Sequence, residues 1–92
     1  MDKRNSLNLI ASKLLEIGDN KNIAESREID LVIFSVTKKL DKNIKYEFRN
    51  YLYTFGLISV FATPEVRSNN VFIIEKKKIN EFLKIYKDGV PE

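Results

Sequence analysis

The spacing of apolar residues changes at Gly56, and this change limits what the chain can fold into. Before the glycine, apolar residues recur at helical spacing, at Ile44, Phe48, Tyr51, Leu52 and Phe55. After it, the segment LISVFA alternates in the manner of a strand. Because glycine commonly ends a helix, the pattern predicts a helix over about residues 42–55, a stop at Gly56 and a strand over residues 57–62.

An amphipathic helix is predicted near the start of the chain, over residues 6–17. Its apolar residues share one helical face, at Leu7, Ile10, Ala11, Leu14 and Ile17. Asn5 or Ser6 can cap its first turn, and Gly18 stands where a left-handed C-cap residue belongs. The polar segment GDNKNIAES that follows predicts a loop.

A second helix is predicted over residues 26–40, whose apolar residues again keep helical spacing. Ser26 is a plausible N-cap, and Lys38 and Lys39 suit the negative end of the helix dipole in the last turn. The segment LVIFSVT, residues 31–37, is rich in β-branched residues, so a strand there remains the alternative.

The second half of the chain predicts a β-hairpin and a closing helix. The segment VFIIE, residues 71–75, has strand character, and TPEVRSNN before it has turn character. With the strand at residues 57–62, these segments predict a hairpin whose long tip carries Arg67, Ser68, Asn69 and Asn70. Residues 76–88 keep helical spacing, and Gly89 ends that helix.

The length and the composition, with 43% hydrophobic and 32% charged residues, fit a single domain over residues 1–92, and the predicted helices and hairpin place it in the α+β class. The chain has neither histidine nor cysteine. This removes the commonest general base, the commonest transition-metal ligand, disulfides and thiolate metal sites. Only three glycines are present, and none forms a phosphate-binding loop or nucleophile elbow. We therefore expect no enzyme activity, no cofactor and no metal.

Hydrophobic segments long enough to cross a bilayer are absent from the sequence. The first residues are basic and then apolar, but Asn8, Ser12 and Lys13 interrupt the apolar run, so we expect no signal peptide. A cytoplasmic protein without a membrane partner or an evident small-molecule substrate is the resulting expectation.

Positive charge is concentrated in the second part of the chain. Residues 1–30 carry five basic and six acidic side chains, whereas residues 31–92 carry eleven basic and seven acidic ones. A basic region of this kind is compatible with nucleic-acid binding. A solvated, lysine-rich surface explains the same imbalance without any partner.

The outer face of the 42–55 helix, opposite its apolar residues, collects cations, amides and phenols. These are Lys42, Asn43, Tyr46, Arg49, Asn50 and Tyr53, with Lys45 at the border. Arginine pairs with guanine and asparagine with adenine in the major groove, while lysine and tyrosine hold phosphates. The solvated face of an amphipathic helix is the alternative interpretation.

The order of elements, three helices followed by a hairpin and a closing helix, resembles the winged helix-turn-helix family of DNA-binding proteins. The sharpest local similarity is LYTFGLISVF with NNVFIIEKKKINEFL, where Gly56-Leu57-Ile58 matches the step from the third helix into the wing. The likeness covers about residues 6–88. It looks closest to small archaeal plasmid or viral proteins and to regulators of the PadR or MarR type.

This resemblance implies a third helix in the major groove of double-stranded DNA and a wing that reaches the adjacent backbone or minor groove. The implied wing contacts are Arg67, Ser68, Asn69 and Asn70, although serine and asparagine are also ordinary turn residues. The run Lys76–Lys78 invites a phosphate contact, but cations oppose the dipole at a helix start. We expect this run to span the strand end and the cap.

The resemblance further implies a transcriptional regulator or a plasmid partition factor that binds an operator, as a homodimer paired through its first and last helices. Ile85 lies off the main apolar face of the last helix and adds apolar surface for such pairing. The alternative is a winged helix that binds another protein and no DNA, because tyrosine and arginine are also enriched in protein hot spots.

Overall fold

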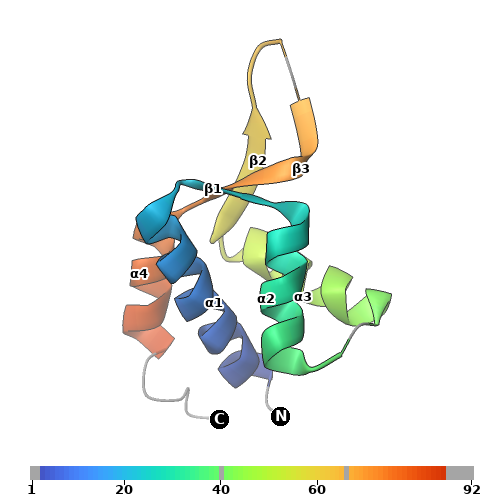
Figure 1. Ribbon diagram of the computed structural model, residues 1–92. Coiled ribbons are helices and arrows are strands. Elements are labelled where there is room, and N and C mark those ends of the chain that lie inside the picture. The colour runs from blue at the N-terminus through green and yellow to red at the C-terminus, as the bar shows by residue number, and fades with distance from the viewer. Residues whose placement is uncertain (1–2, 40, 66, 87–92) are drawn as a thin grey trace.

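The computed structural model describes residues 3–39, 41–65 and 67–86 and has an α+β architecture. Four helices and three strands occur in this described part, with the bounds α1 Lys3–Asn20, β1 Ile23–Glu25, α2 Ser26–Thr37, α3 Lys42–Thr54, β2 Ile58–Ala62, β3 Arg67–Ile74 and α4 Lys76–Tyr86. The helices gather into one layer, and the β2–β3 hairpin projects from it (Figure 1). The α+β class is thus confirmed.

The three strands form an antiparallel sheet in the order β1-β3-β2. Ile73 of β3 lies opposite Ile23 on one side and Ser59 on the other. The sequence predicts a loop where β1 lies, and this prediction is wrong. Three residues are too few to show an alternation, and β1 exists because it pairs with β3, which is some fifty positions away in the chain. This pairing ties the α1–α2 connection to the base of the hairpin.

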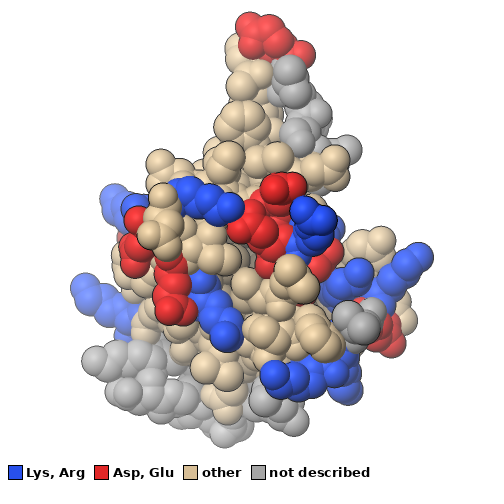
Figure 2. Space-filling model, viewed as in Figure 1, with Lys and Arg blue, Asp and Glu red and all other residues tan. Residues whose placement is uncertain are grey.

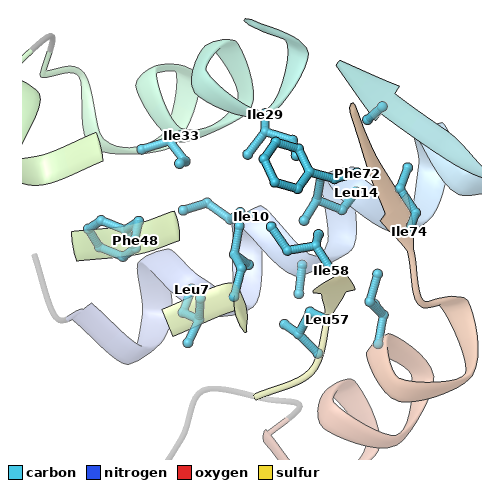
Figure 3. Close-up of a cluster of buried hydrophobic side chains, with 14 of the residues drawn as sticks. Leu7, Ile10, Leu14, Ile29, Ile33, Phe48, Leu57, Ile58, Phe72 and Ile74 are labelled. Atoms are coloured by element: carbon cyan, nitrogen blue, oxygen red, sulfur yellow. The ribbon is translucent and has the colours of Figure 1, made fainter. Parts of the chain in front are cut away.

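A continuous core lies between the helices and the inner face of the sheet. Its largest fully buried side chains come from every helix and from β2, namely Ile10, Leu14, Ile29, Ile33, Leu52, Leu57, Ile58 and Ile79. Figure 3 shows Ile10 and Leu14 of α1 among side chains from α2, α3 and the sheet. Helix α1 contacts α2, α3, α4 and β3, so it is the central element of the fold.

Helix α1 is longer than the sequence predicts at both ends. It begins at Lys3, so Ser6 is a buried helical residue and not an N-cap. It also continues past Gly18, which therefore is no left-handed C-cap. A Cβ atom at Gly18 would lie 3.0 Å from Ile74 Cγ2 and 3.0 Å from Lys76 Cγ. The glycine serves close packing of α1 against the junction of β3 and α4.

The segment 31–37 is helical, which confirms α2 and excludes the strand alternative. The N-cap is Glu25 and not Ser26. The backbone N–H of Glu25 donates to the carboxylate of Glu28 at 3.0 Å, in a capping box. Because β1 runs directly into α2, the residue that ends the strand takes the cap position.

Helix α2 ends at Thr37, three residues before the predicted end. Lys38 follows in the left-handed region with φ 61°, and its N–H donates to the carbonyl oxygen of Phe34 at 2.7 Å. Lys38 and Lys39 therefore lie beyond the last turn, in the connection to α3, and not inside it as the sequence predicts. Leu40, the predicted last residue, lies outside the described residues.

Gly56 ends α3 as predicted, with φ 73°. The N–H of Leu57 donates to the carbonyl of Leu52 at 2.8 Å, and that of Gly56 to the carbonyl of Tyr53 at 2.9 Å. These two bonds form a Schellman motif. Leu52 and Leu57 are both fully buried, so the motif also directs the chain from the core helix into β2.

Phe55 is the one predicted core residue of this segment that the structure leaves largely exposed, at 44%. It is the C-cap residue of α3, and the chain turns away from the core directly after it. Its ring lies 5.4 Å from the ring of Phe82 on α4, between centroids. The helical spacing continues to Phe55, but the core does not extend that far.

The hairpin has a longer second strand and a shorter turn than predicted, while its first strand begins one residue later, at Ile58. Strand β3 begins at Arg67, which pairs with Ala62, so the predicted tip residues 67–70 belong to a strand. The side chains of residues 67–69 lie outside the described part of the structure, and Asn70 is exposed. The end of the last predicted helix and Gly89 also lie outside it.

We expect Phe48→Ala to lower the free energy of unfolding by about 3–5 kcal/mol, because it deletes a buried ring from the core. Phe48 is 3% exposed, whereas Phe55 on the same helix is 44% exposed. Phe55→Ala is therefore the matched control and is expected to cost clearly less. Urea titration followed by circular dichroism measures both. Equal losses would contradict the assignment of Phe48 to the core.

We expect Glu28→Gln to lower stability at pH 7 and to weaken its pH dependence in acid. The hydrogen bond from Lys21 and the N–H of Glu25 hold the pKa of Glu28 below its ordinary value of 4.5. Charge on Glu28 thus stabilises the fold fully above pH 4.5, and this contribution is lost as the pH falls through the lower folded pKa.

Thermal unfolding measured from pH 7 to pH 3 checks this expectation. The difference between wild type and Glu28→Gln should shrink as the pH falls below 4.5 and disappear below the lower folded pKa, where Glu28 is neutral in the folded and unfolded states. Glu81→Gln, at an exposed position of α4, is the control. A wild-type advantage that stays constant down to pH 3 would contradict the electrostatic role of Glu28.

Candidate nucleic-acid interface

The outer face of α3 carries the polar set predicted from the helical period. Tyr46 is 60% exposed and Tyr53 39% exposed. Exposed positions also include Lys42, Asn43 and Asn50. These five side chains lie on the side of α3 that faces away from Phe48 and Leu52, and we call them the α3 outer face. They offer donors and acceptors at the ends of short or planar side chains, which suits a base edge or a phosphate.

Arg49 is predicted to share this face, but the structure pairs it with α2. Its Nε donates to Asp30 Oδ1 at 2.9 Å and its Nη2 to Asp30 Oδ2 at 2.8 Å. Nη2 also donates to the hydroxyl of Ser26. Arg49 and Asp30 are both about one quarter exposed, so the pair is half-buried. Two donors of the planar guanidinium are thus occupied by a carboxylate of the same chain.

Asp30 and Ser26 are the hydrogen-bond partners of Arg49, and the sequence predicts neither contact. Both sit at the start of α2, where acidic and hydroxyl residues are already explained by capping and the helix dipole. Their distance from Arg49 along the chain is 19 and 23 residues. Only the packing of α2 on α3 brings the three side chains together. No local spacing rule could have found this contact.

A group of lysines surrounds the α2–α3 connection. Exposed or half-buried ammonium groups there belong to Lys38, Lys39, Lys42 and Lys45. The ion pairs of Lys3, Lys21 and Arg49 in the described part of the chain do not involve this group. Asp41 lies among these lysines, and its carboxylate accepts the N–H of Asn43 at 2.6 Å as the N-cap of α3. The group, which we call the lysine cluster, adjoins the positive end of the α3 dipole.

Acidic side chains gather on the hairpin side of the same surface. Glu25 and Asp30 line a shallow pocket with Asn70, and Glu65 lies in the hairpin turn. Figure 2 shows acidic residues at the end of the hairpin, and acidic and basic residues side by side near its base. Arg27 lines the same pocket, so side chains of both charges lie near the base of the hairpin.

Tyr53 joins α3 to the sheet. Its ring packs edge-on against Phe72 of β3, with 5.8 Å between centroids. Burial raises the pKa of Tyr53 above its ordinary value of 10, although Arg49 acts in the opposite direction. The hydroxyl is thus a neutral hydrogen-bond donor at pH 7, held beside the base of the hairpin.

The sequence predicts that the run Lys76–Lys78 spans the strand end and the cap of the last helix. This prediction is wrong, because the run lies in the first turn of α4. The stem of Lys76 approaches Gly18, and that of Lys78 approaches Gly56. The aliphatic parts of these two lysines therefore cover glycines of two different helix ends. Their packing explains lysines at an otherwise unfavourable helix start.

Metal-binding clusters and membrane-spanning helices are both absent from the residues that the structure describes. In residues 3–39, 41–65 and 67–86, acidic side chains form no group of three that could hold a metal ion. None of the helices in these ranges combines the length and apolar character that a bilayer span requires.

Comparison with known proteins gave no relative from which a function could be transferred. No protein-family model matches the chain, and neither a curated protein nor a solved structure proved similar to it. The α3 outer face and the lysine cluster are therefore the observations that bear on function.

Proposed function

We propose that the chain is a winged helix-turn-helix protein that binds double-stranded DNA, with α3 in the major groove and the β2–β3 hairpin as the wing. The element order supports this fold, because α1, α2 and α3 precede a two-stranded hairpin. The β1–β3 pairing strengthens the case, since it closes a small sheet at the base of the proposed wing. The observation that carries the function is the exposed polar face of α3.

The α3 outer face suits a base-reading role. Tyr46 is the most exposed of its aromatic side chains, and Asn50 lies one turn beyond it. Large exposed phenols are uncommon where a helix merely faces solvent, and here they stand beside amides. Amides form paired hydrogen bonds with adenine in a groove wide enough to admit a helix.

The lysine cluster supports the phosphate part of the same proposal. A duplex whose major groove holds α3 passes its backbone near the start of that helix, where the dipole is positive. Lys42 lies in the first turn of α3, and Lys38 and Lys39 lie in the connection before it. Such contacts position the protein on DNA without reading the sequence. The proposed cellular role is that of a transcriptional regulator or a partition factor at an operator.

We expect the chain to bind duplex DNA with a steep dependence on salt, and Lys42→Gln to reduce the slope of log K against log salt by about one. Fluorescence anisotropy with a labelled duplex at several salt concentrations measures the slope. Lys84→Gln on α4 is the control, because Lys84 lies in the last turn of a different helix. Its slope should equal that of the wild type.

Absence of duplex binding even at low salt would overturn the DNA proposal. A second candidate would then apply, a protein-docking role for the exposed aromatic residues. Phe55 and Tyr51 line a shallow groove with Leu7, beside Lys3 and Arg4 of α1. This groove is the observation that favours the second candidate, because exposed aromatic side chains are typical anchors of protein interfaces.

A homodimer is part of the proposal, because paired half-sites would match a two-fold protein. The supporting observation is Ile85 on α4, which is 72% exposed. We expect Ile85→Ser to shift the sedimentation coefficient towards that of a monomer. Leu31→Ser on α2 is the matched control, since Leu31 is an aliphatic residue with 60% exposure. A wild type that sediments as a monomer at all concentrations would contradict the dimer.

A further inference from the structure

Arg49 is the only arginine of α3, and its hydrogen-bonding fork is occupied inside the protein. Two nearly parallel bonds join its Nε and Nη2 to the two carboxylate oxygens of Asp30. The hydroxyl of Ser26 accepts a further bond from Nη2. The contact to guanine O6 and N7 requires the same two-pronged geometry. Arg49 cannot make both contacts at once.

Asparagines carry the amide groups of the α3 outer face, which can donate and accept a pair of hydrogen bonds. Asn43 and Asn50 are exposed and stand seven residues apart, which places them on the same side of the helix. Seven residues span about 10 Å of helix, which is about three base steps of 3.4 Å. Tyr46 lies between them along the helix. An amide that pairs with a base in two bonds selects adenine through N6 and N7.

We propose that Asp30 holds Arg49 away from the bases and thereby sets the base preference of α3. With the arginine withheld, Asn43 and Asn50 read the duplex and select A·T pairs about three steps apart. Arg49 then acts as a positioning residue that fixes α3 against α2. This inference rests on the proposed DNA-binding function and adds the class of site that is bound.

Release of Arg49 is the direct test. Asp30→Asn keeps the size of the side chain and removes its charge, so the guanidinium becomes available to DNA. Wild type and variant are titrated with two duplexes of equal length, one with A·T pairs at the core and one with G·C pairs there. Wild type should prefer the A·T duplex. The ratio of the two affinities should move towards G·C by about tenfold in the variant.

The ratio of the affinities for the A·T and G·C duplexes distinguishes a base contact of Arg49 from a general effect of the altered charge. Removal of an acidic group strengthens binding to any duplex, but it strengthens both duplexes equally. The double variant Asp30→Asn/Arg49→Met keeps the charge change of Asp30 and deletes the guanidinium without adding an amide that could read adenine. It should return to the wild-type ratio. Equal gains on both duplexes in Asp30→Asn, or a persistent G·C shift in the double variant, would overturn the inference.

Arg49→Met alone keeps the inference testable if Asp30→Asn does not fold, as judged by circular dichroism. Sequences selected from random duplex DNA by Arg49→Met should match those selected by the wild type, even if the variant is less stable. Loss of a selected guanine in this variant would show that Arg49 reads bases and would refute the inference. Failure of the wild type to bind any duplex would instead refute the proposed function.

Discussion

The burial of α1 is the constraint on which the rest of the structure depends. Ile10 and Leu14 are fully buried at the centre of the core, and α1 contacts every other helix. A 92-residue chain can form only a small hydrophobic core, so one central helix packs against several other elements. Gly18 allows α1 to approach the junction of β3 and α4 closely enough for this. The position of the hairpin relative to α2 and α3 follows from that approach.

Local patterns of the sequence predict the elements that depend on local physics. Helix α3 and its end at Gly56 are predicted well. The apolar spacing of the helix and the preference of glycine for a positive φ both depend on residues that are close together in the sequence. The segment 31–37 shows the limit of propensity, since its β-branched residues are helical in the structure. Packing of Ile29, Ile33 and Val36 into the core outweighs the weak strand preference.

Features that depend on distant contacts could not be predicted. Strand β1 forms only because β3 is next to it, and Gly18 is explained by Ile74 and not by its own helix end. In the candidate site, periodicity separates the outer face of α3 correctly for Tyr46 and Asn50. It says nothing of Asp30, because the contact of this carboxylate with Arg49 joins two helices and spans 19 positions of the chain.

The Arg49–Asp30 pair changes what the charges of this surface can do. A bidentate contact is geometrically specific, and partial burial protects it from screening better than an exposed pair. It joins α2 to α3 and removes one cation from the α3 outer face. Positive charge at that face then comes from the lysine cluster, whose ammonium groups are less directional than a guanidinium.

This division suits recognition of a polyanion by two separate means. Tyr53 packs against Phe72, so the end of α3 and the base of the hairpin share one contact, while Arg49 secures the start of α2 to the same helix. Helix α3 is thus held from two sides. In the proposed complex with DNA, the amides would provide selectivity and the lysines would provide affinity, because base contacts specify a sequence and phosphate contacts only position the protein.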